Sequence, residues 1–105
     1  MAPSSIRVLV ADDSEAFSNF ICSKLQRRPF VQVICQVSDG LMAVREAQHL
    51  QPHLVLLEVR LPTLNGIAAA RQIRKFSPKS KILIVSQESS ADMPQLAFNA
   101  GASGY

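Results

Sequence analysis

Short apolar runs alternate with amphipathic stretches along this chain. Four of the runs predict β-strands, and they cover residues 6–11, 31–37, 54–58 and 81–86. Between them, apolar side chains recur every three or four positions, which is the spacing of a helix with one buried face. Strands that alternate with helices through short loops favour right-handed βαβ crossovers. The sequence therefore predicts an α/β fold built on a parallel sheet.

The second run differs from the other three. Residues 31–37 largely alternate apolar and polar side chains, whereas the other runs are almost continuously apolar. A strand that is polar on one side suits the edge of a sheet, and an apolar strand suits its centre. This pattern fits a doubly wound sheet with strand order 2-1-3-4-5. The fifth strand would begin near Gly104, so we expect that strand and the fifth helix to be largely missing.

Length and composition limit the class of protein. The chain has 105 residues, of which 48% are hydrophobic and 18% charged, and this composition predicts a single globular domain over residues 1–105. We expect this domain to be truncated at its C-terminal end. We find no signal peptide and no apolar run of the roughly 18 residues that span a bilayer, so we expect a cytoplasmic protein without a membrane partner. Cys22 and Cys35 are expected to be free, buried thiols. The basic residues are scattered without interleaved aromatics, which argues against a nucleic-acid footprint on this domain.

Acidic residues follow two of the strands that we expect at the centre of the sheet. Asp12 and Asp13 follow the first strand, and Glu58 ends the third. Because the carboxyl ends of neighbouring parallel strands meet at one edge, we expect these three carboxylates to converge there. Clustered carboxylate oxygens suit a hard divalent cation.

Four motifs together give the chain a family resemblance. They are residues 8–14, 58–66, 82–86 and 100–105. With these motifs the chain resembles the receiver domain of two-component response regulators, over essentially its whole length, and its loop spacing is similar to regulators with a helix-turn-helix output domain. The resemblance implies a flavodoxin-like fold and a domain that is not an enzyme. It also implies phosphorelay signal transduction, in which a conformational change acts on an output domain that regulates transcription.

The resemblance also implies partners and residue roles. A histidine kinase or another signalling protein would bind the domain, and DNA would be contacted only through the missing output domain. Asp13 would bind Mg²⁺ directly, Asp12 mostly through water, and the backbone carbonyl of Arg60 would be a further ligand. Ser86 would be the switch hydroxyl that binds a phosphoryl group, and Tyr105 the switch aromatic whose rotamer reports activation.

The phospho-acceptor position departs from the family, because Glu58 stands where the family has aspartate. One methylene moves a carboxylate by about 1.5 Å, and a misplacement of about 1 Å can cost on the order of a hundredfold in rate. We therefore expect phosphorylation-independent or phosphomimetic behaviour, and weakened Mg²⁺ binding. The sequence leaves open whether Glu58 is native or engineered, and whether it is only a solvated acid at a strand end.

Two further departures concern the same edge. Gln87 follows the switch hydroxyl, where the family usually has a small residue, and it either blocks access to the site or is an ordinary loop residue. The family's lysine would lie beyond Tyr105, so a bound cation, Arg60 or a raised carboxyl pKa must relieve the repulsion among the carboxylates. We also expect the fourth strand to be an open edge with exposed apolar surface, which predicts self-association or domain swapping.

Other functions remain as alternatives. A small Mg²⁺-dependent phosphatase would use Asp12 or Asp13 as its nucleophile, and a pure protein-interaction module would need neither metal nor phosphate. A flavodoxin-like nucleotide binder would need a glycine-rich phosphate loop, whereas acids follow the first strand here. The sequence does not identify the cognate kinase or the output target.

Overall fold

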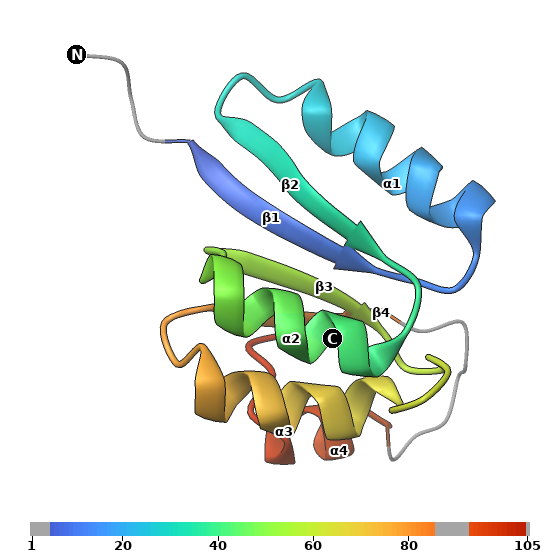
Figure 1. The fold of residues 1–105 in the computed structure, drawn as a ribbon, viewed down its shortest axis with the longest axis vertical. Coiled ribbons are helices and arrows are strands. Elements are labelled where there is room, and N and C mark those ends of the chain that lie inside the picture. Colours follow the sequence, from blue (N-terminus) through green and yellow to red (C-terminus); the bar gives the residue numbers. More distant parts are fainter. Residues whose placement is uncertain (1–4, 86–92, 105) are drawn as a thin grey trace.

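Strands and helices alternate along the chain in the computed structural model, which describes residues 5–85 and 93–104 (Figure 1). The strands are β1 (Ile6–Ala11), β2 (Val31–Val37), β3 (Leu54–Glu58) and β4 (Lys81–Val85). The helices are α1 (Glu15–Gln26), α2 (Gly40–Leu50), α3 (Gly66–Phe76) and α4 (Met93–Asn99). Each predicted strand is confirmed as far as the structure describes it. In this part of the chain, no helix combines the length and the apolar character that a membrane crossing requires.

All strand pairs in the sheet are parallel, and the order is β2-β1-β3-β4. The predicted edge position of β2 is therefore confirmed. Ala11 of β1 lies opposite Leu57 of β3, which in turn lies opposite Ile84 of β4. The carboxyl ends of the three strands consequently meet at one edge of the sheet.

The outer edge of β4 is not open in the way that the sequence predicted. The amides of Ser103 and Gly104 donate to the carbonyl of Ile82 at 2.7 and 3.3 Å, and the amide of Ile84 donates to the carbonyl of Gly104 at 3.1 Å. Gly104 also forms an isolated parallel bridge with Leu83. The expectation of an open edge is thus wrong for the middle of β4, because the chain after α4 returns to pair with it.

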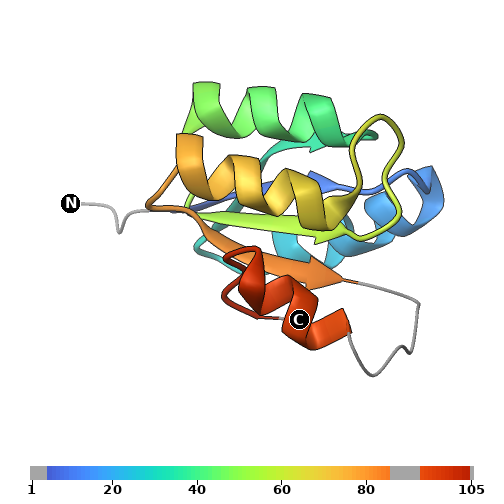
Figure 2. The same ribbon diagram turned by 90° about the horizontal axis from the view of Figure 1, so that it is seen from below.

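Helices cover the two faces of the sheet unequally. Figures 1 and 2 show α2 and α3 together on one face and α1 on the other. The larger core lies under α2 and α3, and its fully buried members include Leu9, Leu57, Ile73, Ile82 and Ile84. The smaller core lies under α1 and consists of Val8, Val10, Cys22 and Leu56. The free thiol of Cys22 is buried as expected, whereas that of Cys35 is only partly buried.

Three helices begin directly after the carboxyl edge with a side-chain cap. Ser14 accepts from the amide of Phe17 at 3.2 Å, and Asp39 accepts from the amide of Met42 at 2.8 Å. Asn65 caps α3 in the same way. These caps satisfy amides that would otherwise lack partners in the first turn. They also fix where α1, α2 and α3 begin relative to the acidic edge.

A polar network holds the opposite end of the sheet. The imidazole Nδ1 of His53 accepts from the amide of Arg7 at 2.9 Å. The hydroxyls of Ser77 and Ser80 share a hydrogen bond of 2.6 Å, and the Ser80 hydroxyl donates to the carbonyl of Pro52. Both serines are about 1% exposed. His53 is exposed, and its bond to Arg7 ties β1 to the start of β3.

Candidate functional site

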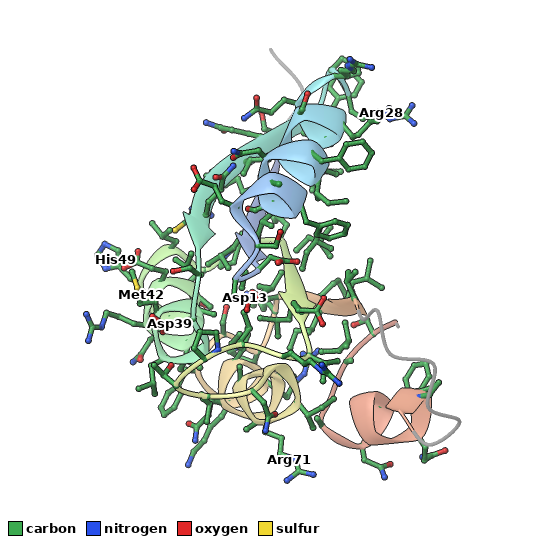
Figure 3. The ribbon with its side chains drawn as sticks, turned by 90° about the vertical axis from the view of Figure 1, so that its right-hand side faces the viewer. Asp13, Arg28, Asp39, Met42, His49 and Arg71 are labelled. Carbon is green, nitrogen blue, oxygen red and sulfur yellow. The ribbon has the colours of Figure 1, made fainter. Side chains whose placement is uncertain are left out.

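The three predicted carboxylates come together at the carboxyl edge of the sheet. Asp12 follows β1, and Glu58 ends the neighbouring strand β3. Asp12 and Glu58 are 7% and 8% exposed, whereas Asp13 is exposed. Figure 3 shows Asp13 at the opposite end of α1 from Arg28. The convergence that the sequence predicted is therefore observed.

Asp12 is held by the turn into α1. Its Oδ1 accepts from the amide of Ser14 at 2.8 Å. Burial raises the pKa of the Asp12 carboxyl, the bond from Ser14 counteracts this, and the negative charge of Asp13 raises it further. The fold therefore holds Asp12 in surroundings that disfavour its charged form.

Glu58 turns its carboxylate back along its own loop. Its Oε1 accepts from the amides of Val59 at 2.9 Å and Arg60 at 3.3 Å. Burial raises the pKa of the Glu58 carboxyl, the bond from Arg60 lowers it, and the charge of Asp12 raises it again, with smaller effects from Val59 and Asp13. A raised carboxyl pKa was one of the three predicted ways to relieve the repulsion, and burial favours it at both Asp12 and Glu58.

The loop that carries Glu58 packs tightly against its neighbours. The amide of Gly66 donates to the carbonyl of Val59 at 2.7 Å, and the amide of Gly40 donates to the carbonyl of Pro62 at 3.0 Å. A Cβ atom on Gly66 would collide with the backbone carbonyl of Glu58, so only glycine permits this approach. The backbone around Glu58 is consequently fixed by α2 and α3.

An apolar hollow adjoins the two buried acids. It is small, about 30 Å³, and lies between α1 and the strands β1, β3 and β4. Its walls are Asp12, Glu58 and a set of apolar side chains, namely Val10, Ala11, Phe17, Ile21, Leu56, Leu57 and Val85. These neighbours replace water around the carboxylates, which is the physical cause of their raised pKa values.

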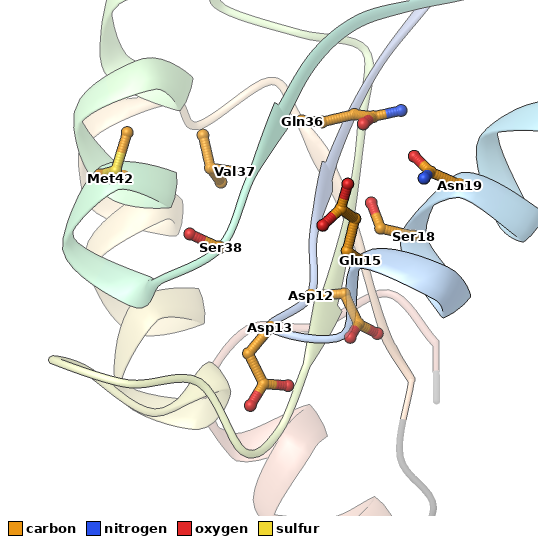
Figure 4. A pocket seen from close by; sticks show the side chains of 9 residues that line it. All are labelled: Asp12, Asp13, Glu15, Ser18, Asn19, Gln36, Val37, Ser38 and Met42. Carbon is orange, nitrogen blue, oxygen red and sulfur yellow. The ribbon is translucent and has the colours of Figure 1, made fainter.

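A larger cavity opens between α1, the end of β2 and the start of α2. Its volume is about 340 Å³, and Figure 4 shows the side chains that line it. They are Asp12, Asp13, Glu15, Ser18, Asn19, Gln36, Val37, Ser38 and Met42. The lining thus contains three carboxylates and no basic side chain. The acidic edge therefore continues into a polar cavity away from Glu58.

Several predicted site residues cannot be assigned a geometry. Ser86, Gln87 and Tyr105 lie outside the described residues. Arg60 is exposed, and its carbonyl as a metal ligand stays a prediction. Among residues 5–85 and 93–104, no group of three or more His, Cys, Asp or Glu side chains is arranged to hold a metal ion. A site of two carboxylates and a carbonyl therefore remains a prediction as well.

Sequence reasoning did not find the polar residues of the larger cavity. Ser18, Asn19 and Gln36 were assigned no role, although Ser18 is 5% exposed. Ser18 lies four residues before Cys22, on the buried face of α1. The available signal for Ser18 was a hydroxyl at a helical position where an apolar side chain is expected. The contribution of Gln36 had no comparable signal, because it depends on how α1 packs beside β2.

Comparison with known proteins gives consistent matches. Residues 8–105 match the family described as the response regulator receiver domain. Response regulator GacA from Pseudomonas viridiflava is 32% identical over 100 residues, which are 95% of this chain and 47% of that protein. A protein-glutamate methylesterase/protein-glutamine glutaminase from Alkalilimnicola ehrlichii is 33% identical over 101 residues, 95% of this chain and 26% of that protein.

A solved structure agrees with these matches. The response regulator domain of Thermotoga maritima CheB aligns with a TM-score of 0.89 and 32% identity, and the alignment covers 95% of this chain and 75% of that one. Against the two curated relatives, this chain spans only 26% and 47% of the full length. The shared part is the α/β domain described above.

Proposed function

This chain belongs to the response regulator receiver domain family, and we propose that it works as a receiver whose acidic edge is uncoupled from phosphorylation at residue 58. In this proposal, the domain passes a two-component signal to an output domain through a conformational change. The input partner is a histidine kinase or another signalling protein. The domain itself performs no turnover.

The observation that carries the proposal is the position of the Glu58 carboxylate. Its Oε1 accepts hydrogen bonds from the amides of Val59 and Arg60, at 2.9 and 3.3 Å. Phosphoryl transfer depends mainly on the position of the nucleophile and on charge stabilisation. A carboxylate whose Oε1 already accepts from two amides is a weaker nucleophile, because these hydrogen bonds stabilise its negative charge.

The donor set at the edge fits a divalent ion such as Mg²⁺. Asp12 and Asp13 supply hard carboxylate oxygens, and their negative charges raise the pKa values of their neighbours. Asp13 would hold the ion directly, with Asp12 behind it and the carbonyl of Arg60 as a further ligand. The ion would supply positive charge that offsets the carboxylates. Glu58 would contribute less, because its Oε1 is already used by amides.

The output is proposed from the relatives. GacA is a response regulator, and the region that matches this chain is under half of it. The matched region of the methylesterase is about a quarter of that protein. We propose a DNA-binding output that regulates transcription, as in regulators of the helix-turn-helix type. A methylesterase output is the alternative that the second relative favours.

The test is intact-mass spectrometry after incubation with Mg²⁺ and acetyl phosphate. We expect no phosphoryl adduct on the unsubstituted chain and a clear adduct on Glu58→Asp, which has the shorter side chain. Glu58→Gln is the matched control, because it keeps the length of Glu58 but is a poor nucleophile. An adduct on the unsubstituted chain that maps to Glu58 or Asp13 would contradict the proposal. No adduct on either protein would favour a pure interaction module.

A further inference from the structure

We propose that Arg74 on α3 is a clamp for the turn after α4, residues 100–104, and that α4 moves about this turn as about a hinge. This role of Arg74 goes beyond the function proposed above, because it does not depend on whether residue 58 accepts a phosphoryl group. Three features of the molecule support it. They are the hydrogen bonds of the Arg74 guanidinium, the packing of Gly101 against it, and the attachment of the turn to β4.

The guanidinium of Arg74 joins two turns that lie far apart in the sequence. Its Nη2 and Nε both donate to the carbonyl of Gly101, at 2.9 and 3.3 Å, and its Nη1 donates to the carbonyl of Pro78 at 2.7 Å. An arginine presents its donors in a rigid planar fork, and hydrogen bonds from a charged donor are stronger than neutral ones. Arg74 therefore holds the end of α3 and the turn after α4 at one spacing.

Gly101 packs directly against the side chain of Arg74. Its φ is 99°, in the left-handed region that glycine tolerates, and a Cβ atom on it would lie 3.1 Å from the Cγ of Arg74 and 3.2 Å from its Nε. Arg74 is half-buried, so water competes less for its donors than it would at the surface. The aliphatic stem and the guanidinium of Arg74 thus both contact the turn.

The rest of the turn is attached to the sheet and to the core. The amides of Ser103 and Gly104 donate to the carbonyl of Ile82 in β4, at 2.7 and 3.3 Å. Ala100 and Ala102 are 3% and 7% exposed, and both belong to the larger core. The turn is consequently held by α3 on one side and by β4 on the other, which makes it the fixed end of α4.

Helix α4 itself is less embedded than the turn that follows it. It is 7 residues long, and Gln95, Phe98 and Asn99 are exposed, Phe98 by 53%. Figure 2 shows α4 at the side of the sheet that β4 forms. Segments with few buried side chains open locally at a lower free energy than the elements of the core. We therefore assign the movement to α4 and the pivot to the turn at Gly101.

Amide hydrogen exchange followed by NMR tests this hinge at each residue. In the unsubstituted chain, we expect the amides within α4 to be less protected than those of Ser103, Gly104 and Ile84, because α4 can open while the turn stays closed. Ile84 is grouped with the turn because its amide donates to the carbonyl of Gly104. In Arg74→Ala, the protection factors of these three amides should fall by about tenfold, toward those of α4, since the variant removes hydrogen bonds from a charged donor.

Two further variants make the result decisive. Arg71→Ala removes an exposed arginine from the preceding turn of α3 and should leave the protection factors unchanged. Arg74→Lys keeps the charge but loses the planar fork, so it should show a smaller fall, and it replaces Arg74→Ala if that variant does not fold.

Three outcomes would overturn the proposal. One is unchanged protection of Ser103 and Gly104 in the Arg74 variants. Another is an equal fall at Leu57 in the centre of the sheet, which would show that Arg74 only stabilises the domain as a whole. The third is an unsubstituted chain in which α4 is as well protected as the turn.

Discussion

A single methylene decides what the carboxylate of Glu58 can reach. The longer side chain lets Oε1 return to the amides of Val59 and Arg60. An aspartate at the same position would hold its carboxylate nearer to the strand end, because its side chain is shorter by about one C–C bond, roughly 1.5 Å. If position 58 is the phospho-acceptor position, as proposed, glutamate in place of aspartate changes the direction of the charge as well as its distance.

Cys35 offers a test at the scale of a single residue, because its environment disfavours ionisation of the thiol. Burial raises the pKa of the Cys35 thiol, and the negative charge of Glu46 raises it further. The thiolate is the reactive form. At pH 8 we therefore expect iodoacetamide to modify Cys35 at least several-fold more slowly than an unstructured peptide cysteine. Mass spectrometry of timed samples measures this.

Two comparisons complete that experiment. Glu46→Gln should speed the modification of Cys35, because it removes the nearby negative charge. Raising the pH should speed it more steeply than it does for the peptide, since the thiolate of Cys35 forms at higher pH. Modification of Cys35 at the rate of the peptide would show that its surroundings do not suppress ionisation.

At the scale of the elements, the start of α2 is joined to the loop that follows β3. Asp39 caps α2 at the amide of Met42, and it also accepts from the hydroxyl of Thr63 at 3.1 Å. The hydroxyl of Thr63 in turn accepts from the amide of Leu41 at 3.1 Å. Thr63 has a φ of 66°, in the left-handed region, so these bonds hold a backbone that is otherwise unfavourable. One side chain thus serves both a helix and a loop.

Asp39→Ala should therefore lower the free energy of unfolding by more than the loss of an exposed helix cap alone would. We expect the free energy of unfolding to fall by about 1–2 kcal/mol, the upper part of the range for lost caps. Urea titration followed by circular dichroism measures it. Asp39→Asn is the control, because its amide oxygen can still accept from Met42, and it should retain most of the stability. An alanine variant as stable as the natural chain would show that the cap contributes nothing.

At the scale of the whole molecule, the face under α1 is less covered than the face under α2 and α3. Helix α1 packs over β1 and β2, and Figure 1 shows it displaced from β3 and β4. Leu54 and Leu83 are only partly buried at this face, beside the smaller core. Apolar surface that remains in contact with water favours association.

We accordingly expect this 105-residue chain to self-associate. Light scattering coupled to gel filtration should show a mass that rises above the monomer as concentration increases. Leu83→Glu places a charge on the exposed face and should restore the monomer across the same range. An unsubstituted chain that stays monomeric at the highest concentration would contradict this, since the hydrogen bonds from Ser103 and Gly104 would then protect β4 sufficiently.

The strands and the sheet order could be predicted because they follow from local patterns. Continuous apolar runs place β1 and β3 inside, and the polar residues of β2 place it at the edge. The run in β4 also predicted a central strand, whereas β4 ends the sheet and has only the isolated bridge to Gly104 on its outer side. The meeting of Asp12 with Glu58 follows from the same order. The bridge between Gly104 and Leu83 agrees with the fifth strand that was predicted to begin near Gly104. The turned-back Glu58 and the cavity at Ser18 depend on rotamers and on packing between distant segments. No local pattern carries that information.

The buried serine network at the far end of the sheet has a mechanical consequence. The bonds among Arg7, His53, Pro52, Ser77 and Ser80 tie the starting ends of the strands together, with every polar partner supplied from within the chain. The acids lie at the other end of the same strands, where loops rather than a buried network hold the backbone. These bonds restrain the starting ends of the strands, so we expect any displacement that a ligand causes to be larger at the acidic edge than at the serines.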